Sequence, residues 1–124
     1  MHLFQQGAFK LHSGNPSWFK IDCDELAKED WDTIAKLTVQ RVGYFGSIEG
    51  VPTGGYEFAK ALRRYCSIGD PLLIVDDVFT TGISMETQRA GRDAIGVVLF
   101  ARNPTPSWIT SIFQLTPVMT MPYE

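Results

Sequence analysis

The chain has 124 residues and a net charge of −3, and 44% of its residues are hydrophobic, 12% aromatic and 20% charged. This composition excludes a disordered or fibrous protein, and the length predicts one folded domain over residues 1–124. The Lys and Arg residues are scattered along an acidic chain, so we expect no nucleic acid partner.

The cysteines and histidines give no sign of a disulfide framework or a zinc site. Cys23, Cys66, His2 and His12 are the only residues of these types, and they lack zinc-ligand spacing. No stretch is long and apolar enough to span a bilayer, and the N-terminus lacks the pattern of a secretion signal. A soluble cytoplasmic protein without a membrane partner is therefore the expectation.

Residues 1–23 are predicted to form a small flap, or hood. Short strands are expected at residues 9–11 and 18–22, on either side of a turn at residues 13–16 that contains Gly14, Asn15 and Pro16.

Residues 24–103 alternate apolar strands with helical stretches, and we take them as the core. Helices are expected at 28–41, 56–65 and 83–90, and strands at 45–50, 72–75 and 95–101. This order predicts an α/β fold with a mostly parallel sheet flanked by helices. Residues 104–124 contain four prolines and are predicted to form a tail, with a possible edge strand at 112–115.

Two predicted strands run directly into a tight loop that leads to a helix. The first loop has the sequence VPTGG and consists of Val51, Pro52, Thr53, Gly54 and Gly55. The second loop consists of Thr80, Thr81, Gly82, Ile83 and Ser84. Because ligands of open α/β sheets bind at the carboxyl ends of the strands, we expect the site to lie where these loops meet.

The second loop and the acids before it point to one kind of ligand. Backbone N–H groups and hydroxyls at the start of a helix suit a phosphate monoester. Asp76 and Asp77 would repel that phosphate, so they are expected to face hydroxyl donors or a cation. A phosphorylated ribose, with or without Mg²⁺, satisfies both requirements.

The stretch LLIVDDVFTTGIS, residues 72–84, resembles the PRPP signature of the type I phosphoribosyltransferases. In that signature four apolar residues precede two acids, two variable positions, Thr-Thr-Gly, one variable position and Ser. The resemblance implies PRPP as substrate, Mg²⁺ as cofactor, and Asp76 and Asp77 as catalytic residues. It also implies that Mg²⁺ is held through PRPP rather than by a fixed set of protein ligands, with these aspartates contacting it at most through water.

Three further segments resemble the orotate members of that family. FKLHSGNPSWFKID, residues 9–22, is similar to a segment that helps to cover the base, which implies base contacts for His12 and Phe19. The VPTGG loop stands where the family has its pyrophosphate loop. Arg102, just past a strand, stands where the orotate enzymes have an arginine that contacts the base, and a guanidinium suits an orotate-like carboxylate.

The sequence departs from the orotate enzymes at three places. His12 stands where they usually carry a lysine, and Ile83 where Gly or Ala is common. Residues 66–71 replace the long basic loop that covers the departing pyrophosphate. A weak enzyme, an enzyme completed by a partner subunit and a ligand sensor therefore stay open.

The first hypothesis is a transferase that moves ribose 5-phosphate from PRPP to an orotate-like pyrimidine base and releases pyrophosphate. The second is a non-catalytic regulator that binds PRPP or a nucleotide. An RNA-binding regulator is disfavoured by the acidic balance.

An apolar run before Asp-Asp also occurs in ATPase strands and receiver domains, but the chain has no GxxxxGK[ST] loop and its acids do not follow the first strand. The family resemblance and the aromatic tail predict a homodimer.

Overall fold

The computed structural model describes residues 4–10 and 16–115, and the side chains from Asp22 to Leu115. Its strands are β1 (Phe4–Lys10), β2 (Pro16–Ile21), β3 (Ser47–Gly50), β4 (Leu72–Phe79), β5 (Ala94–Ala101) and β6 (Ile109–Gln114). Its helices are α1 (Lys28–Val42), α2 (Tyr56–Leu62) and α3 (Ile83–Arg89), with short 3₁₀ turns η1 (Cys23–Glu25) and η2 (Arg63–Tyr65).

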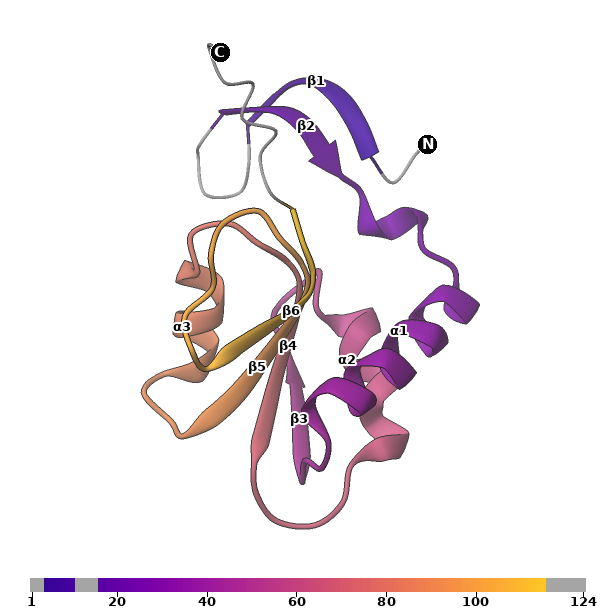
Figure 1. The fold of residues 1–124 in the computed structure, drawn as a ribbon, viewed down its shortest axis with the longest axis vertical. Coiled ribbons are helices and arrows are strands. Elements are labelled where there is room, and N and C mark those ends of the chain that lie inside the picture. The colour runs from indigo at the N-terminus through magenta and orange to yellow at the C-terminus, as the bar shows by residue number, and fades with distance from the viewer. Residues whose placement is uncertain (1–3, 11–15, 116–124) are drawn as a thin grey trace.

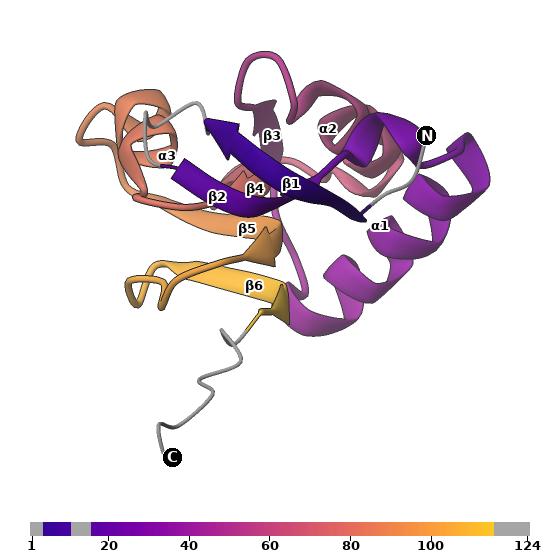
Figure 2. The ribbon, with the colours of Figure 1, turned by 90° about the horizontal axis from the view of Figure 1, so that it is seen from above.

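Strands β3 to β6 form one parallel sheet in the order β3-β4-β5-β6. Helices α1 and α2 cover one face of this sheet, and α3 covers the other (Figures 1 and 2). The predicted α/β fold, a mostly parallel sheet flanked by helices, is therefore confirmed. The expected edge strand is the fourth parallel strand, β6, and it begins three residues earlier than predicted, at Ile109.

The core has two layers because consecutive strand residues point to opposite faces of the sheet. On β4, Leu73 and Val75 belong to the cluster that includes Trp31 and Phe58 from α1 and α2. Ile74 belongs to the cluster with Met85 on the α3 side. Burial on both faces explains why the central strands read as unbroken apolar runs.

The N-terminal flap is an antiparallel hairpin of β1 and β2, with Phe4 opposite Ile21. It lies on the side of the carboxyl ends of the sheet strands (Figures 1 and 2). The first strand begins five residues earlier than predicted, since cross-strand pairing extends it over polar residues that have no strand pattern of their own. The predicted turn residues 13–15 lie outside the described residues.

Two more boundaries differ from the prediction by three residues or more. Strand β4 does not end at Val75 but continues to Phe79, which pairs with Ala101 of β5. The helix expected at 56–65 ends at Leu62 and continues as the 3₁₀ turn η2. None of the helices in the described part of the chain has the length and apolar character of a membrane span.

Candidate functional site

Asp76 and Asp77 lie inside β4, near its carboxyl end, rather than in a loop. Asp76 is 6% exposed, and its Oδ1 accepts a 2.8 Å hydrogen bond from the amide of Asp77. Oδ1 of Asp77 accepts a 2.7 Å bond from the amide of Val78. The two neighbouring carboxylates are thus held by the strand's own backbone.

The two carboxylates serve different sides of the sheet. Asp76 lines a small hollow with residues of the second loop, on the α3 side. Asp77 lies against Gly54 of the first loop, on the α2 side. Because consecutive side chains of β4 point to opposite faces of the sheet, one aspartate lies beside each loop.

Asp76 has an altered titration because it is buried. Burial raises its pKa to about 8, and the negative charge of Asp77 adds to the shift. Both effects favour the protonated form of the Asp76 carboxyl in the ligand-free protein. Burial also raises the pKa of the Cys23 thiol, with the charges of Asp77 and Asp22 acting in the same direction.

The first loop is folded tightly onto β4, and its glycines make that close approach possible. A Cβ at Gly54 would lie 2.4 Å from Oδ2 of Asp77, and a Cβ at Gly55 would lie 2.5 Å from the carbonyl oxygen of Val75. A side chain at position 54 would require the Asp77 carboxylate or the loop to move, and one at position 55 would require the backbone to move. The loop and Asp77 are therefore in direct contact.

Only part of the first loop is available to bind a ligand through its amides. The Val51 amide donates to Val75 O at 2.9 Å, and the Gly55 amide donates to Val51 O at 2.8 Å. Pro52 has no N–H, and the Pro52–Thr53 peptide is cis. Among the described residues, the amides of Thr53 and Gly54 have no backbone acceptor, which narrows the predicted pyrophosphate site to these two.

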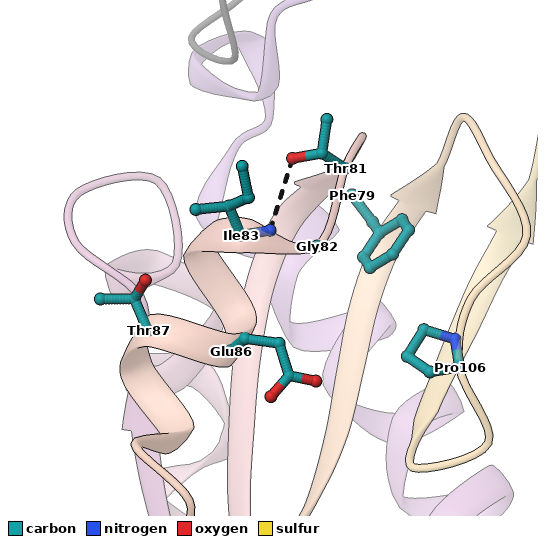
Figure 3. Close-up of a pocket in the computed structure, with 7 residues that line it drawn as sticks. All are labelled: Phe79, Thr81, Gly82, Ile83, Glu86, Thr87 and Pro106. Carbon is teal, nitrogen blue, oxygen red and sulfur yellow. Dashed lines mark hydrogen bonds between the residues drawn. The ribbon is translucent and has the colours of Figure 1, made fainter.

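The second loop begins where β4 ends and has a left-handed residue at its turn. Gly82 has φ +88°, and a Cβ there would lie 3.0 Å from the Phe79 ring. The Ile83 amide lies 3.4 Å from Oγ1 of Thr81 (Figure 3). Within the part of the chain that is described, the amides of Thr80, Thr81 and Gly82 donate no hydrogen bond.

A hollow of about 20 Å³ lies at this loop, next to Asp76. It is lined by Asp76, Val78, Phe79, Thr80, Thr81, Gly82, Ser84 and Met85. The backbone and hydroxyl groups predicted to bind a phosphate therefore do lie beside one of the two acids. The hollow has room for about one water, so it is too small to enclose a sugar phosphate.

A larger cavity of about 280 Å³ lies beside the second loop, between α3 and the connection from β5 to β6. It is lined by Phe79, Thr81, Gly82, Ile83, Glu86, Thr87 and Pro106 (Figure 3). Its carboxylate, Glu86, is already bound by Arg89 at 2.7 Å and by the Trp108 indole at 2.9 Å. Neither aspartate lines it, so we place the candidate site at the smaller hollow, where Asp76 and the unpaired amides of the second loop meet.

Of the residues predicted to contact the base, only Arg102 lies in the fully described region. It follows β5, its amide donates to Phe79 O at 2.9 Å, and burial lowers the pKa of its guanidinium. Phe19 lies in β2, in the flap, and its side chain is not described. His12 lies outside the described residues.

The connection at residues 66–71 is as short as the sequence indicated, and it carries no basic residue. It joins η2 to the amino end of β4, opposite the end that holds the aspartates (Figure 1). There the hydroxyl of Tyr44 donates to Ile68 O. This connection therefore brings no positive charge to the site.

Two groups near the site were not predicted. Glu49, just before the first loop, binds the Arg92 guanidinium through both carboxylate oxygens at 2.7 and 2.8 Å, and this pairing lowers its pKa to about 2. Asn103 donates to Thr80 O at 2.5 Å. Glu49 stands just before the VPTGG loop, so the sequence could have indicated it as a site residue. Asn103 gave no such signal, because a polar residue before a proline is typical of any turn.

Comparisons with known proteins identify the fold. No protein-family model matches the chain, and no curated protein matches it significantly in sequence. The orotate phosphoribosyltransferase of Aeropyrum pernix is similar in structure, with a TM-score of 0.71 and 24% identity over 90% of this chain and 88% of that one. Two structures of the Mycobacterium tuberculosis orotate phosphoribosyltransferase are similar as well. The one with Fe(III) dicitrate has a TM-score of 0.65 and 17% identity over 90% of this chain and 89% of that chain. The one with inorganic phosphate has a TM-score of 0.63 and 18% identity over 90% and 88%.

At this level of identity the likeness establishes the architecture. The chain has the type I phosphoribosyltransferase fold, in the form found in the orotate enzymes.

Proposed function

We propose that this protein binds PRPP with Mg²⁺ and transfers its ribose 5-phosphate to an orotate-like pyrimidine base, releasing pyrophosphate. The observation that carries the proposal is the contact between Gly54 and Asp77. This contact brings the first loop against the strand that leads into the second loop, and unpaired amides lie in both loops near the acid pair. The shared fold of the orotate enzymes supports the same conclusion.

In this proposal the second loop binds the 5′-phosphate through its amides and the hydroxyls of Thr80, Thr81 and Ser84. The ribose hydroxyls donate to Asp76 and Asp77, which also stabilise positive charge that develops on the ribose during transfer. Because burial favours the protonated form of Asp76 in the free protein, binding that ionises Asp76 is expected to release a proton.

The residues present fit Mg²⁺ as a shared ion rather than a resident one. Among the described residues no group of three or more candidate ligands gathers to hold a metal, and Mg²⁺ commonly uses one or two carboxylates together with substrate phosphates and water. Pyrophosphate at the Thr53 and Gly54 amides would lie next to the Asp77 carboxylate, a repulsive arrangement. When bound, Mg²⁺ would neutralise that repulsion and the charge of the leaving pyrophosphate.

The base is expected between Arg102 and the flap. The Arg102 guanidinium suits an orotate-like carboxylate, and Phe19 and His12 of the flap are proposed to cover the ring. A homodimer and a cytoplasmic location stay predictions from the family resemblance.

A second candidate function rests on the connection at residues 66–71. Because this short segment lies at the far end of β4, nothing from it covers the departing pyrophosphate or excludes water from the reacting carbon. A non-catalytic protein that binds PRPP or a nucleotide would need no such cover.

Release of pyrophosphate separates the two functions. We would incubate the protein with PRPP, Mg²⁺ and either orotate, uracil or guanine, with Asp76→Asn/Asp77→Asn as the matched control. Release with orotate that the control lacks supports the transferase. Binding of PRPP without release for any base supports the regulator and contradicts catalysis.

A further inference from the structure

We propose that Asn103 is a positioning residue that aims the amides of the second loop at the phosphate. The proposal rests on the proposed function, because it assumes that this loop binds the 5′-phosphate. Asn103 lies in the connection after β5, and its side chain is exposed.

The first two carbonyl groups at this turn are bound from the same side. Phe79 O accepts a 2.9 Å hydrogen bond from the Arg102 amide, and Thr80 O accepts a 2.5 Å bond from Nδ2 of Asn103. The first bond comes from the backbone and is independent of the side chain at 102. The second depends entirely on the side chain at 103.

Peptide geometry turns these two bonds into an orientation of the loop. The peptide bonds that follow Phe79 and Thr80 are trans, so the C=O and the N–H of each unit point in opposite directions. With the carbonyls facing the 102–103 segment, the N–H groups of Thr80 and Thr81 face away from it. These amides have no acceptor in the described chain, and their residues line the hollow beside Asp76.

Asn103 is itself held in place by the edge strand. Nε2 of Gln114 donates to Asn103 O at 3.2 Å and to Ala101 O at 3.3 Å. Oγ of Ser111 lies 3.2 Å from Oε1 of Gln114. The chain of bonds thus runs from β6 through Asn103 to the start of the second loop.

The hydrogen bond from Asn103 to Thr80 O matters for electrostatic reasons. If the peptide between Thr80 and Thr81 rotated, its carbonyl oxygen would take the place of the N–H and would repel an anion. We expect removal of the donor to weaken phosphate-ester binding by about three- to tenfold, which is about 0.65–1.4 kcal/mol and lies within the range for a typical intramolecular hydrogen bond.

The test uses Asn103→Leu, which keeps the approximate size but removes the donor. Asn103→Gln restores an amide donor, and Ser107→Leu places the same leucine at an exposed position in the same connection. Ribose 5-phosphate is the probe, measured by calorimetry and by the ¹H–¹⁵N shifts of the Thr80 and Thr81 amides, with urea unfolding as the stability control. Asn103→Ala, which adds no apolar surface, is the second variant if the leucine variant aggregates.

We expect Asn103→Leu to bind about three- to tenfold more weakly, with smaller shifts at the Thr81 amide, while Asn103→Gln recovers affinity and Ser107→Leu matches the wild type. If the wild type binds ribose 5-phosphate and both Asn103→Leu and Asn103→Ala bind it with the same affinity as the wild type, the role of Asn103 is overturned while the proposed function stands. A wild-type protein that binds no ribose 5-phosphate would overturn the proposed function and this inference together.

Discussion

The two strand-loop-helix junctions share one topology, yet each is built differently. In the first, the loop lies against β4, and its glycines are required because backbone and carboxylate atoms approach within contact distance. In the second, Gly82 is required because its φ is +88°. One junction is shaped by close packing and the other by backbone conformation.

The junctions also differ in where their hydrogen bonds go. The first loop satisfies the amides of Val51 and Gly55 within itself and with β4. At the second loop, residues 102–103 bind the carbonyls of Phe79 and Thr80, and the amides of Thr80, Thr81 and Gly82 are unpaired among the described residues. Each peptide unit carries one N–H donor and one C=O acceptor. A loop that keeps its N–H groups free for a ligand therefore needs other residues to bind its C=O groups and fix its orientation.

The largest expected effect comes from removing the acids that the two junctions share. Asp76→Asn/Asp77→Asn should weaken PRPP binding by about a hundredfold or more, because each carboxylate loses charge-assisted hydrogen bonds from the ribose. Calorimetry measures the loss, and circular dichroism should show an unchanged fold. Affinity within a few-fold of the wild type would remove the acids from the site.

Adding one methyl group at Gly54 is expected to disrupt the packing of the first junction. In Gly54→Ala the new Cβ would lie 2.4 Å from Oδ2 of Asp77, so the carboxylate or the loop must move. We expect a loss of about tenfold in PRPP affinity and about 1–3 kcal/mol in the free energy of unfolding. Unaltered affinity in a folded Gly54→Ala protein would show that the contact is not part of the ligand site.

The acid on the side of the second junction gives the free protein a pH dependence of stability. The pKa of Asp76 is raised from 3.8 to about 8, so between these values the folded state binds more protons than the unfolded state. Stability is therefore favoured at low pH and is lost as the pH rises through the folded pKa, by at most about 1.4 kcal/mol per pH unit. Urea unfolding from pH 5 to 8 measures this slope, and Asp76→Asn should flatten it. An equal slope in that variant would assign the effect to other groups.

The second junction is tested by the conformation of its glycine. Gly82→Ala should lower the free energy of unfolding by about 1–2 kcal/mol because φ is positive there, and it should also weaken ribose 5-phosphate binding. Gly91→Ala is the matched control, since Gly91 has φ +75° with nothing within 4 Å of an added Cβ. It should lose similar stability but no affinity. An equal affinity loss in both variants would indicate a global effect rather than a local one.

The sequence was sufficient to predict the α/β fold and to place both loops and both acids at the carboxyl ends of strands, because apolar runs and glycine-rich loops are local signals. It was not sufficient to predict that β4 continues to Phe79, since pairing with β5 decides where that strand ends. The contact between Gly54 and Asp77 and the bond from Asn103 to Thr80 join residues 23 positions apart in each case. Such contacts depend on how neighbouring strands and their loops pack, and no periodicity in the sequence records them.

The central claim is that the two junctions form one site for a phosphorylated ribose, and a calorimetric titration of the protein with PRPP and Mg²⁺ tests it most directly. Run at pH 7 in two buffers of different ionisation enthalpy, it should show saturable binding with release of a proton as Asp76 ionises. Saturable binding without proton release would contradict the role given to Asp76. Absence of binding would contradict the site itself.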